Sequence, residues 1–335
     1  MKKILFIATG GTIASKQTEN GLAPGFSAED LLAEIPEVRE ICEFDCIQLC
    51  NLDSTNIYPK HWIYLSDVIR DSYGNYDGFI ISHGTDTMAY TAAGLSYLIQ
   101  NSLKPVILTG SQIPIGEDGS DAVKNLRDSF AAACDDRLKG VFVVFCGFVI
   151  AGTRVKKIKS QSFDSMYSMN FPNVAEIHDG CLAFNEEYLT PQNGETEFYN
   201  RLDPKVGVLK FVPGTKPDLL EYMLNVNDAV IVESYGVGGI PGTSEFDFFS
   251  VIEKAKDAGK FVIIATQSFL DGTDLGKYEV GRVLKENFDV IEIYDMTVES
   301  AYAKIMWILG RTSNKEEVTE LFYTPVLYDI NINKQ

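Results

Sequence analysis

Residues 78–100 read GFIISHGTDTMAYTAAGLSYLIQ and contain the strand, turn and helix from which the fold is predicted. GFIIS (78–82) is an uninterrupted apolar run of strand length. The polar turn HGTDT follows it, and an alanine-rich segment, about 87–100, then predicts a helix. Continuous rather than alternating hydrophobicity is typical of strands that are covered on both faces, as in a parallel sheet with helical crossovers.

The same succession of strand, polar turn and helix recurs along the chain. Further strands are predicted at 3–8, 43–50, 105–110 and 140–146, and again at 206–211, 228–236 and 260–267. Further helices are predicted over about 59–73, 120–134, 218–225, 245–258 and 298–310. Strands that alternate with helices indicate an α/β fold with parallel sheets.

A change of composition divides this series in two. In residues 186–205 apolar side chains become scarce, and Pro, Asn, Gly and charged residues gather. We therefore predict a larger N-terminal catalytic α/β domain over 1–185, with a mainly parallel sheet flanked by helices. Residues 186–205 are predicted to be a linker, and 206–335 a smaller α/β domain with its own parallel sheet. A chain of 335 residues is long enough for two cores.

Charge and composition exclude several classes of partner. The net charge of −18 argues against nucleic acid and against an anionic membrane surface. The apolar run after the two N-terminal lysines is too short for a signal peptide, and no stretch approaches the length of a transmembrane helix. Six cysteines without a CxxC pair predict buried free thiols and a reducing cytoplasm rather than disulfides or a metal site. They are Cys42, Cys46, Cys50, Cys134, Cys146 and Cys181.

Polar residues gather where the predicted strands end, in TGGT (9–12), NLDSTN (51–56), HGTDT (83–87) and TGSQ (109–112). Ligands of open parallel sheets bind beyond the carboxyl ends of the strands. Familiar nucleotide, metalloprotease and serine hydrolase motifs are absent, because no GxGxxG, complete P-loop, HExxH or GxSxG occurs. The remaining chemistry is that of threonine hydroxyls.

Thr12 is the first candidate nucleophile. Glycines at 10 and 11 would allow a substrate to approach the backbone and would leave N–H groups free for an oxyanion. A lysine in GTRVKKIKS (152–160) is a candidate base, since a desolvated amine can take a proton from threonine. TGGT also fits a tight turn without chemistry, and the lysines fit a solvated basic surface.

HGTDT supplies a second hydroxyl, Thr85, with Asp86 beside it. The alternative is structural: Thr87 caps the helix that follows, and Thr85 and Asp86 are turn residues. For His83 we predict a packing and hydrogen-bonding role at the strand end rather than a chemical one.

Two long signatures, TGGTIAS (9–15) and DGFIISHGTDTMAYTAAGLSYLI (77–99), resemble the asparaginase/glutaminase family of amidohydrolases. The resemblance continues through LTGSQIP (108–114), SDAVKNLRDSFAAA (120–133), the RVKK block and SYGVGG (234–239), and so covers essentially the whole chain. It is greatest to the bacterial cytoplasmic, type I branch.

The resemblance implies the catalytic residues. Thr12 matches the threonine that attacks the substrate amide to give a β-aspartyl ester. Thr85, Asp86 and Lys157 match a second triad, with Lys157 identified by its spacing from Arg154. In the family this second threonine is assigned either to the activation of water or to assistance of the first attack.

The resemblance also implies how the substrate is bound. Asp86 matches the carboxylate that holds the α-ammonium group, and Ser54 and Thr55 match the pair at the α-carboxylate and α-ammonium end. Three further positions are expected to line the pocket, mainly through their backbone: Gly11, Gly84 and Ser111.

The implied reaction converts L-asparagine and water to L-aspartate and ammonia, without metal or cofactor, in a homodimer or homotetramer. A broader glutaminase-asparaginase is an alternative, because one methylene shifts selectivity by only about 1–3 kcal/mol. A second alternative is a non-catalytic amino-acid sensor on the same fold. The related component of the tRNA-dependent amidotransferase carries an additional N-terminal domain, for which the eight residues before TGGT are expected to leave no room.

Two positions depart from the family pattern. Leu22 stands where many members carry a tyrosine on the loop after the nucleophile. Tyr294 matches a position that neighbouring subunits contribute in the family, and we predict that it substitutes for that tyrosine; simple packing is the alternative. Glu233 stands where allosteric type I enzymes carry arginine, so activation by asparagine is not expected.

Overall fold

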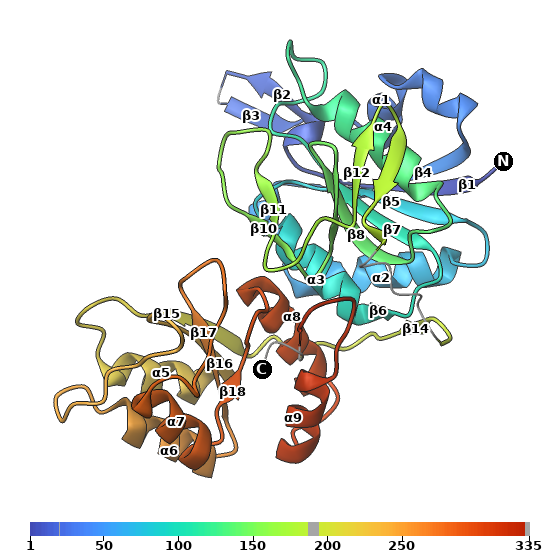
Figure 1. The fold of residues 1–335 in the computed structure, drawn as a ribbon. Coiled ribbons are helices and arrows are strands. Elements are labelled where there is room, and N and C mark those ends of the chain that lie inside the picture. Colours follow the sequence, from blue (N-terminus) through green and yellow to red (C-terminus); the bar gives the residue numbers. More distant parts are fainter. Residues whose placement is uncertain (20, 187–193, 332–335) are drawn as a thin grey trace. The chain divides into compact units, whose positions relative to one another are not determined.

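The structure, a computed structural model, describes residues 1–19, 21–186 and 194–331. It divides the chain into two units, Met1–Asn200 and Arg201–Gln335 (Figure 1). Part of the predicted linker, residues 187–193, lies outside the described residues. Strand β14 (Glu197–Phe198), which follows it, pairs with β6 (Ile99–Gln100) in the first unit.

The first unit is built on an eight-stranded sheet with the order β13-β12-β9-β8-β7-β5-β1-β4. The five strands from β8 to β4 are parallel, and β9, β12 and β13 each run antiparallel to the preceding neighbour. The bounds are β1 (Lys3–Gly10), β4 (Glu43–Leu52), β5 (Gly78–Ser82), β7 (Pro105–Thr109), β8 (Gly140–Phe145), β9 (Phe148–Ala151), β12 (Ala175–His178) and β13 (Cys181–Phe184). The predicted mainly parallel sheet is therefore confirmed; its antiparallel extension was not foreseen.

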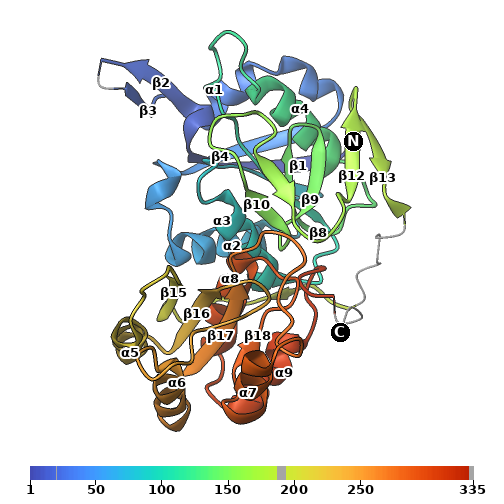
Figure 2. The same ribbon diagram turned by 60° about the vertical axis from the view of Figure 1, so that its left-hand side comes forward.

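Helices cover both faces of this sheet (Figures 1 and 2). Helices α1 (Ala28–Ala33) and α4 (Ala122–Ala133) lie on one face, and α2 (Pro59–Ser72) and α3 (Met88–Leu98) on the other. Almost every residue of α3 is buried, because the sheet and α2 enclose it. Gly94 permits the close contact with α2: a Cβ there would lie 2.5 Å from Cε3 of Trp62.

The second unit contains the predicted smaller parallel sheet, with the order β15-β16-β17-β18. Its strands are β15 (Val206–Lys210), β16 (Ala229–Ser234), β17 (Phe261–Thr266) and β18 (Ile291–Glu292). Its helices are α5 (Pro217–Val226), α6 (Phe248–Asp257), α7 (Glu279–Asn287), α8 (Val298–Leu309) and α9 (Lys315–Tyr323). Leu220, Ile252 and Leu284 pack the first three helices into one core with Val230 and Ile264 of the sheet.

Short elements that extend from the large sheet carry four of the residues selected from the sequence, Thr12, Ser54, Thr55 and Lys157. They are the 3-10 turns η1 (Thr12–Ala14), η2 (Pro36–Glu40) and η3 (Ser54–Asn56), and the hairpins formed by β2 (Ser15–Thr18) with β3 (Gly21–Pro24) and by β10 (Val155–Lys157) with β11 (Met166–Ser168). Among the described residues, no helix is long and apolar enough to cross a membrane.

All six cysteines are free thiols, but their burial differs from the prediction. Only Cys42 is fully buried, and Cys181 is exposed. Cys181 lies on β13, the last strand of the sheet, where no further strand covers it. The prediction that every thiol is buried is therefore wrong at this edge.

Candidate active site

Four loops that follow neighbouring strands carry the selected residues. The strand order β7-β5-β1-β4 places the loops that contain Ser111, Thr85, Thr12 and Ser54 beside one another at the carboxyl ends of the strands. Because the strands are parallel, residues that are far apart in sequence meet at this single edge.

Two glycines allow these loops to touch through their backbones. Gly11 has a φ of 82°, and a Cβ there would lie 2.3 Å from the amide nitrogen of Gly84. A Cβ on Gly84 would lie 2.6 Å from Oγ of Ser54. Atoms at such distances overlap, so the contact among the three loops requires glycine at both positions.

Thr12 is the first residue of η1 and is partly exposed. Its turn is held by Ser15, whose hydroxyl donates to the carbonyl of Gly11 at 3.0 Å. Within the described ranges, the Thr12 hydroxyl has no hydrogen-bond partner. The Thr9 hydroxyl, by contrast, is buried and donates to the carbonyl of Ser82 at 2.8 Å. This hydrogen bond links the carboxyl ends of β1 and β5.

The hairpin β2–β3 follows Thr12 directly. The amides of Gly25 and Phe26 both donate to the carbonyl of Ala14, each at 2.9 Å, and so fix the base of the hairpin beside η1. Leu22, at the position of the missing tyrosine, belongs to β3 and pairs with Gln17 of β2.

Lys157 joins Thr85 and Asp86 into one hydrogen-bonded group. Its Nζ donates to Oγ1 of Thr85 at 2.7 Å and to Oδ1 of Asp86 at 2.6 Å. The Thr85 residue is 4% exposed, whereas the Lys157 and Asp86 side chains are 16% and 57% exposed. Lys159, in the same basic block, pairs instead with Asp164. The structure thus distinguishes Lys157 from its neighbour by what each contacts.

Ser54 and Thr55 lie in η3, whose first turn is organised by an aspartate. Oδ1 of Asp53 accepts from both the amide and the hydroxyl of Thr55, each at 2.8 Å. Asp53 is not among the residues selected from the sequence, although an Asp just before Ser-Thr is a recognisable capping pattern. The Thr87 hydroxyl donates to the carbonyl of Ser54 at 2.7 Å and makes no capping hydrogen bond to α3. The alternative of a side-chain cap is therefore wrong; Thr87 connects two loops of the site.

His83 lies fully buried beneath the HGTDT turn. Its Nδ1 lies 2.7 Å from the carbonyl oxygen of Gly84, and its Nε2 lies 3.0 Å from the hydroxyl of Thr91. Burial lowers the pKa of His83 to about 4, so the ring is neutral at pH 7. Both nitrogens are engaged within the protein, which fits the predicted packing and hydrogen-bonding role.

Ser111 and Tyr294 form their side-chain hydrogen bonds with residues other than Thr85, Asp86 and Lys157. The buried Ser111 hydroxyl donates to the carbonyl of Ile113 at 2.6 Å. Tyr294 belongs to the second unit, where its hydroxyl accepts from Nζ of Lys285 at 3.1 Å and its ring lies 5.8 Å from that of Tyr323.

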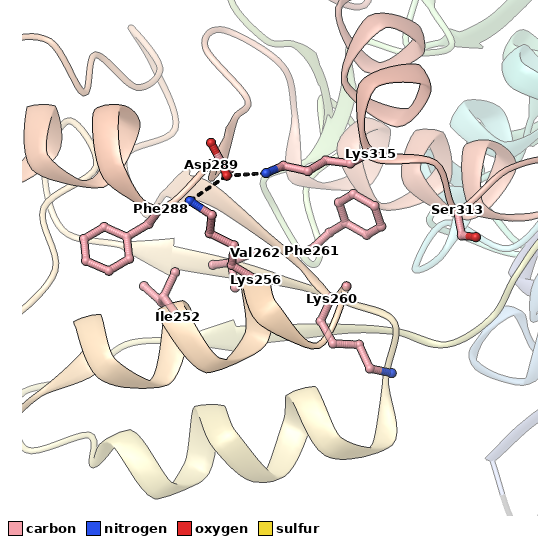
Figure 3. A pocket seen from close by; sticks show the side chains of 10 residues that line it. Ile252, Lys256, Lys260, Phe261, Val262, Phe288, Asp289, Ser313 and Lys315 are labelled. Carbon is pink, nitrogen blue, oxygen red and sulfur yellow. Dashed lines mark hydrogen bonds and ion pairs between the residues drawn. The ribbon is translucent and has the colours of Figure 1, made fainter.

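A cavity of about 50 Å³ lies in the second unit and contains none of the selected residues (Figure 3). Each of its three lysines is paired: Asp289 pairs with Lys315 and, at 2.8 Å, with Lys256, and Lys260 pairs with Asp228 at 2.6 Å. Lys256 also donates to the last carbonyl of α7, at Asn287. Lysines that satisfy a helix end and an aspartate have a structural role. Within the described ranges, no three His, Cys, Asp or Glu side chains are grouped so as to hold a metal.

The loop edge of the first unit therefore combines the groups that an acyl transfer needs. Thr12 offers a free hydroxyl beside the Gly11–Gly84 contact, and Thr85 holds a second hydroxyl against an amine. Asp86 supplies a carboxylate that is open to solvent. A free hydroxyl, a hydroxyl bonded to an amine, and an exposed carboxylate lie on neighbouring loops, and acyl transfer to a hydroxyl uses groups of these kinds.

Comparison with family models divides the chain as the fold does. The model described as "Asparaginase, N-terminal" matches residues 3–189, and the "Glutaminase/Asparaginase C-terminal domain" matches residues 205–322. Among curated proteins, the chain is 38% identical to an L-asparaginase of Thermococcus kodakarensis, with 95% of this chain and 96% of that protein covered. It is 33% identical to a component of the glutamyl-tRNA(Gln) amidotransferase of Pyrococcus abyssi, covering 97% of this chain and 76% of that protein.

Solved structures agree with this similarity. The thermostable L-asparaginase from Thermococcus kodakarensis has a TM-score of 0.92 at 36% identity, covering 98% of this chain and 99% of the other. L-asparaginase I from Vibrio cholerae has a TM-score of 0.87 at 29% identity, covering 99% of each chain. The likeness extends over both units of the chain.

Proposed function

The chain belongs to the asparaginase/glutaminase family of amidohydrolases, and on this basis we propose that it hydrolyses L-asparagine to L-aspartate and ammonia through a covalent threonyl ester. The observation that carries the proposal is the hydrogen-bonded group of Lys157, Thr85 and Asp86 beside the Gly11–Gly84 contact. Membership of the family does not by itself require that these contacts are present in this chain, whereas acyl transfer to a hydroxyl requires such an activating group.

In the first half-reaction, Oγ1 of Thr12 attacks the side-chain amide carbon of asparagine. The carbonyl oxygen becomes an oxyanion, which backbone N–H groups at the glycine-rich turn stabilise. The amide nitrogen takes up a proton and leaves as ammonia, and a β-aspartyl ester of Thr12 remains.

In the second half-reaction, water attacks the ester carbon, and Thr12 leaves with its proton restored. In this proposal Lys157, once deprotonated, accepts a proton through the Thr85 hydroxyl, which lies 2.7 Å from its Nζ. This relay serves either the first attack, by deprotonating Thr12, or the second, by deprotonating water; both assignments use the same contacts.

Binding of the amino-acid end requires both charges to be matched. Asp86 uses Oδ1 for Lys157, so Oδ2 is available to the α-ammonium group of the substrate. The Thr55 hydroxyl already donates to Asp53 and is therefore best suited to accept from the ammonium. Ser54 and the backbone at Gly11, Gly84 and Ser111 complete the pocket and provide donors to the α-carboxylate.

The test is ammonia release from L-asparagine and L-glutamine, measured side by side with Thr12→Ala and Thr12→Ser. We expect no detectable turnover in the first variant and partial turnover in the second, because serine retains the hydroxyl. Thr243→Ala, at an exposed threonine of the second unit, is the matched control. Full turnover by Thr12→Ala would eliminate Thr12 as the nucleophile.

The same assay separates the alternatives. Comparable rates on both amides indicate a broader glutaminase-asparaginase, and binding of asparagine without ammonia release indicates a sensor. The net charge of −18 gives no electrostatic attraction to tRNA, which favours a free amino acid over the substrate class named for the amidotransferase relatives. We place the enzyme in the cytoplasm.

We further propose that Tyr294 acts in a neighbouring subunit of a homodimer or homotetramer and supplies the hydroxyl missing at Leu22. We expect Tyr294→Phe to lower kcat. The dissociation constant of asparagine, measured in the inactive Thr12→Ala variant, should be the same with and without the additional change Tyr294→Phe. Mixing inactive Thr12→Ala chains with Tyr294→Phe chains restores sites whose threonine and tyrosine come from different chains. Unchanged turnover in Tyr294→Phe, or no recovery on mixing, counts against this role.

A further inference from the structure

Asp53 lies directly before Ser54 and Thr55, the pair assigned above to the amino-acid end of the substrate. One oxygen of its carboxylate, Oδ1, accepts from both the amide and the hydroxyl of Thr55, each at 2.8 Å. In the part of the chain that the structure describes, the other oxygen, Oδ2, has no hydrogen-bond partner. The Asp53 side chain is thus directed at a single neighbour, whose hydroxyl it holds.

The backbone of this turn has supports that do not involve the Asp53 side chain. The amide of Asn56 donates to the backbone carbonyl of Asp53 at 2.9 Å. The carbonyl of Ser54 accepts from the Thr87 hydroxyl at 2.7 Å, which ties the turn to the HGTDT loop. Because these contacts hold the backbone, the bond from the Thr55 hydroxyl to Oδ1 has a separate consequence, which is to fix the position of one proton.

The direction of that hydrogen bond determines what Thr55 can bind. A carboxylate only accepts, so the Thr55 hydroxyl is the donor. A hydroxyl has one proton and two lone pairs, and with the proton directed at Asp53 only the lone pairs remain for another partner. Thr55 is exposed, so a ligand can reach them. Lone pairs attract a donor such as an ammonium group and repel an acceptor such as a carboxylate.

The turn that carries Asp53 lies against the loop that carries Asp86. Oγ of Ser54 would lie only 2.6 Å from a Cβ on Gly84, two residues before Asp86. Two carboxylates and the oriented Thr55 hydroxyl are therefore carried by adjoining loops, and all three favour a cation. Hydrogen bonds with a charged partner are stronger than those between neutral groups.

We propose that Asp53 is a positioning residue that makes the site selective for substrates with an α-ammonium group, because it fixes the Thr55 hydroxyl as an acceptor. The inference rests on the proposed function, in which Thr55 faces the α-ammonium group of asparagine. An analogue without that group offers Thr55 no proton to accept. Succinamate, which is asparagine without its α-amino group, is such an analogue and keeps the rest of the molecule.

The experiment measures the dissociation constants of L-asparagine and succinamate by calorimetry, in full-length chains that carry Thr12→Ala to prevent turnover. Selectivity is the dissociation constant of succinamate divided by that of asparagine. We expect Asp53→Ala to reduce this ratio about tenfold or more, as for the loss of a hydrogen bond to a charged group. The reduction should come from weaker binding of asparagine, while the constant of succinamate stays the same.

Further variants show whether Asp53 acts through Thr55. Thr55→Val should lower the selectivity as much as Asp53→Ala, and the double variant should be no less selective than either. Asp53→Asn should keep most of the selectivity, because its amide oxygen still accepts the Thr55 proton. Asp247→Ala is the matched control and should change nothing. Asp247 likewise accepts from the amide and the hydroxyl of one residue, Ser250, at 3.1 and 2.6 Å, but at the start of α6.

Two results would overturn the proposal. One is the parent's selectivity in Asp53→Ala, which would leave Asp53 as a turn residue alone. The other is a further loss of selectivity when Asp53→Ala is added to Thr55→Val, which would mean that Asp53 contacts the substrate directly through Oδ2. The proposed function is tested by a different measurement: if the unmodified chain releases no ammonia from asparagine, that function fails, and the binding constants still decide the role of Asp53.

Discussion

Lys157 in the first unit and Lys304 in the second each place Nζ 2.6 Å from an aspartate oxygen. The side chains of Lys304 and its partner Asp329 are both 0% exposed, and Nζ also donates to the carbonyl of Thr324 at 2.8 Å. Lys157 faces solvent on one side, its partner Asp86 is largely exposed, and its additional contact is the Thr85 hydroxyl.

The difference between these pairs comes from what surrounds them. Burial lowers the pKa of Lys304, although Asp329 opposes this shift. A pair closed to water can only tie α8 to the segment that carries Asp329, and its loss leaves a buried charge. A pair at the edge of a loop can exchange a proton or a partner with an arriving substrate. The same contact distance thus accompanies a sealed pair in one unit and, in the other, the open pair to which we assign a catalytic role.

The largest effect is expected when the amine of the solvent-open pair, Lys157 with Asp86, is removed. We expect Lys157→Met to lower kcat for ammonia release by about 100- to 10,000-fold, because the proton relay is lost. The free energy of unfolding should change by no more than about 1 kcal/mol, as for partly exposed pairs. Lys159→Met, in the same basic block, is the control and should retain activity. Similar losses in both variants would mean that general positive charge, rather than this contact, matters.

Removal of the amine of the closed pair should produce the opposite result. Lys304→Met is expected to destabilise the second unit by about 3–5 kcal/mol, because Asp329 remains buried without its cation. Denaturant unfolding measures this loss. The double variant Lys304→Met/Asp329→Leu should recover much of it, since no charge is left unpaired. If the single variant is as stable as the parent, the buried pair is not a structural link.

The contact between the loops of Gly11 and Gly84 can be tested by substituting alanine for Gly11 and, as a control, for another glycine with positive φ. Gly11→Ala should destabilise the first unit by about 3 kcal/mol and reduce activity, since strain from positive φ adds to a backbone clash. Gly21 also has positive φ, but a Cβ there would meet no described atom within 4 Å. Gly21→Ala should therefore cost only about 1 kcal/mol. Equal effects in thermal unfolding would show that the clash is unimportant.

His83 tests burial in the first unit at a titratable group whose two ring nitrogens face uncharged oxygen atoms, those of the Gly84 carbonyl and the Thr91 hydroxyl. Its pKa falls from 6.5 to about 4 on folding, so the unfolded chain binds more protons between these values. Stability is full above pH 6.5 and is lost as the pH falls; we expect about 2 kcal/mol between pH 7 and pH 5. The slope should shrink in His83→Gln and persist in His178→Gln, at an exposed histidine. An unchanged slope in His83→Gln would assign it to other groups.

The sequence predicted both parallel sheets because their strands are continuous apolar runs, whose burial depends little on tertiary detail. GFIIS is fully buried in β5, and the helix expected after HGTDT is α3. The antiparallel strands β9, β12 and β13 escaped prediction because each has only four residues, although β8–β9 and β12–β13 are hairpins with two-residue turns and only β9–β12 joins distant segments. Short strands carry too little pattern to be recognised without their partners.

The residues of the candidate site could be predicted from the sequence, but the contacts among their side chains could not. TGGT, HGTDT and NLDSTN indicated Thr12, Thr85 and Ser54, because hydroxyls at the carboxyl ends of parallel strands converge. The family resemblance singled out Lys157 by its spacing from Arg154, but the contacts of Lys157 with Thr85 and of Thr87 with Ser54 depend on how separate loops pack.

The sequence by itself thus determined which segments form strands, where these end in hydroxyls and glycines, and which family the chain resembles. These properties are local, since they follow from hydrophobic period and backbone freedom within a few residues. Only the tertiary structure decided that Lys157 is open to solvent while Lys304 is sealed from it. Exposure and pKa depend on neighbours that are distant in sequence, so no local pattern encodes them.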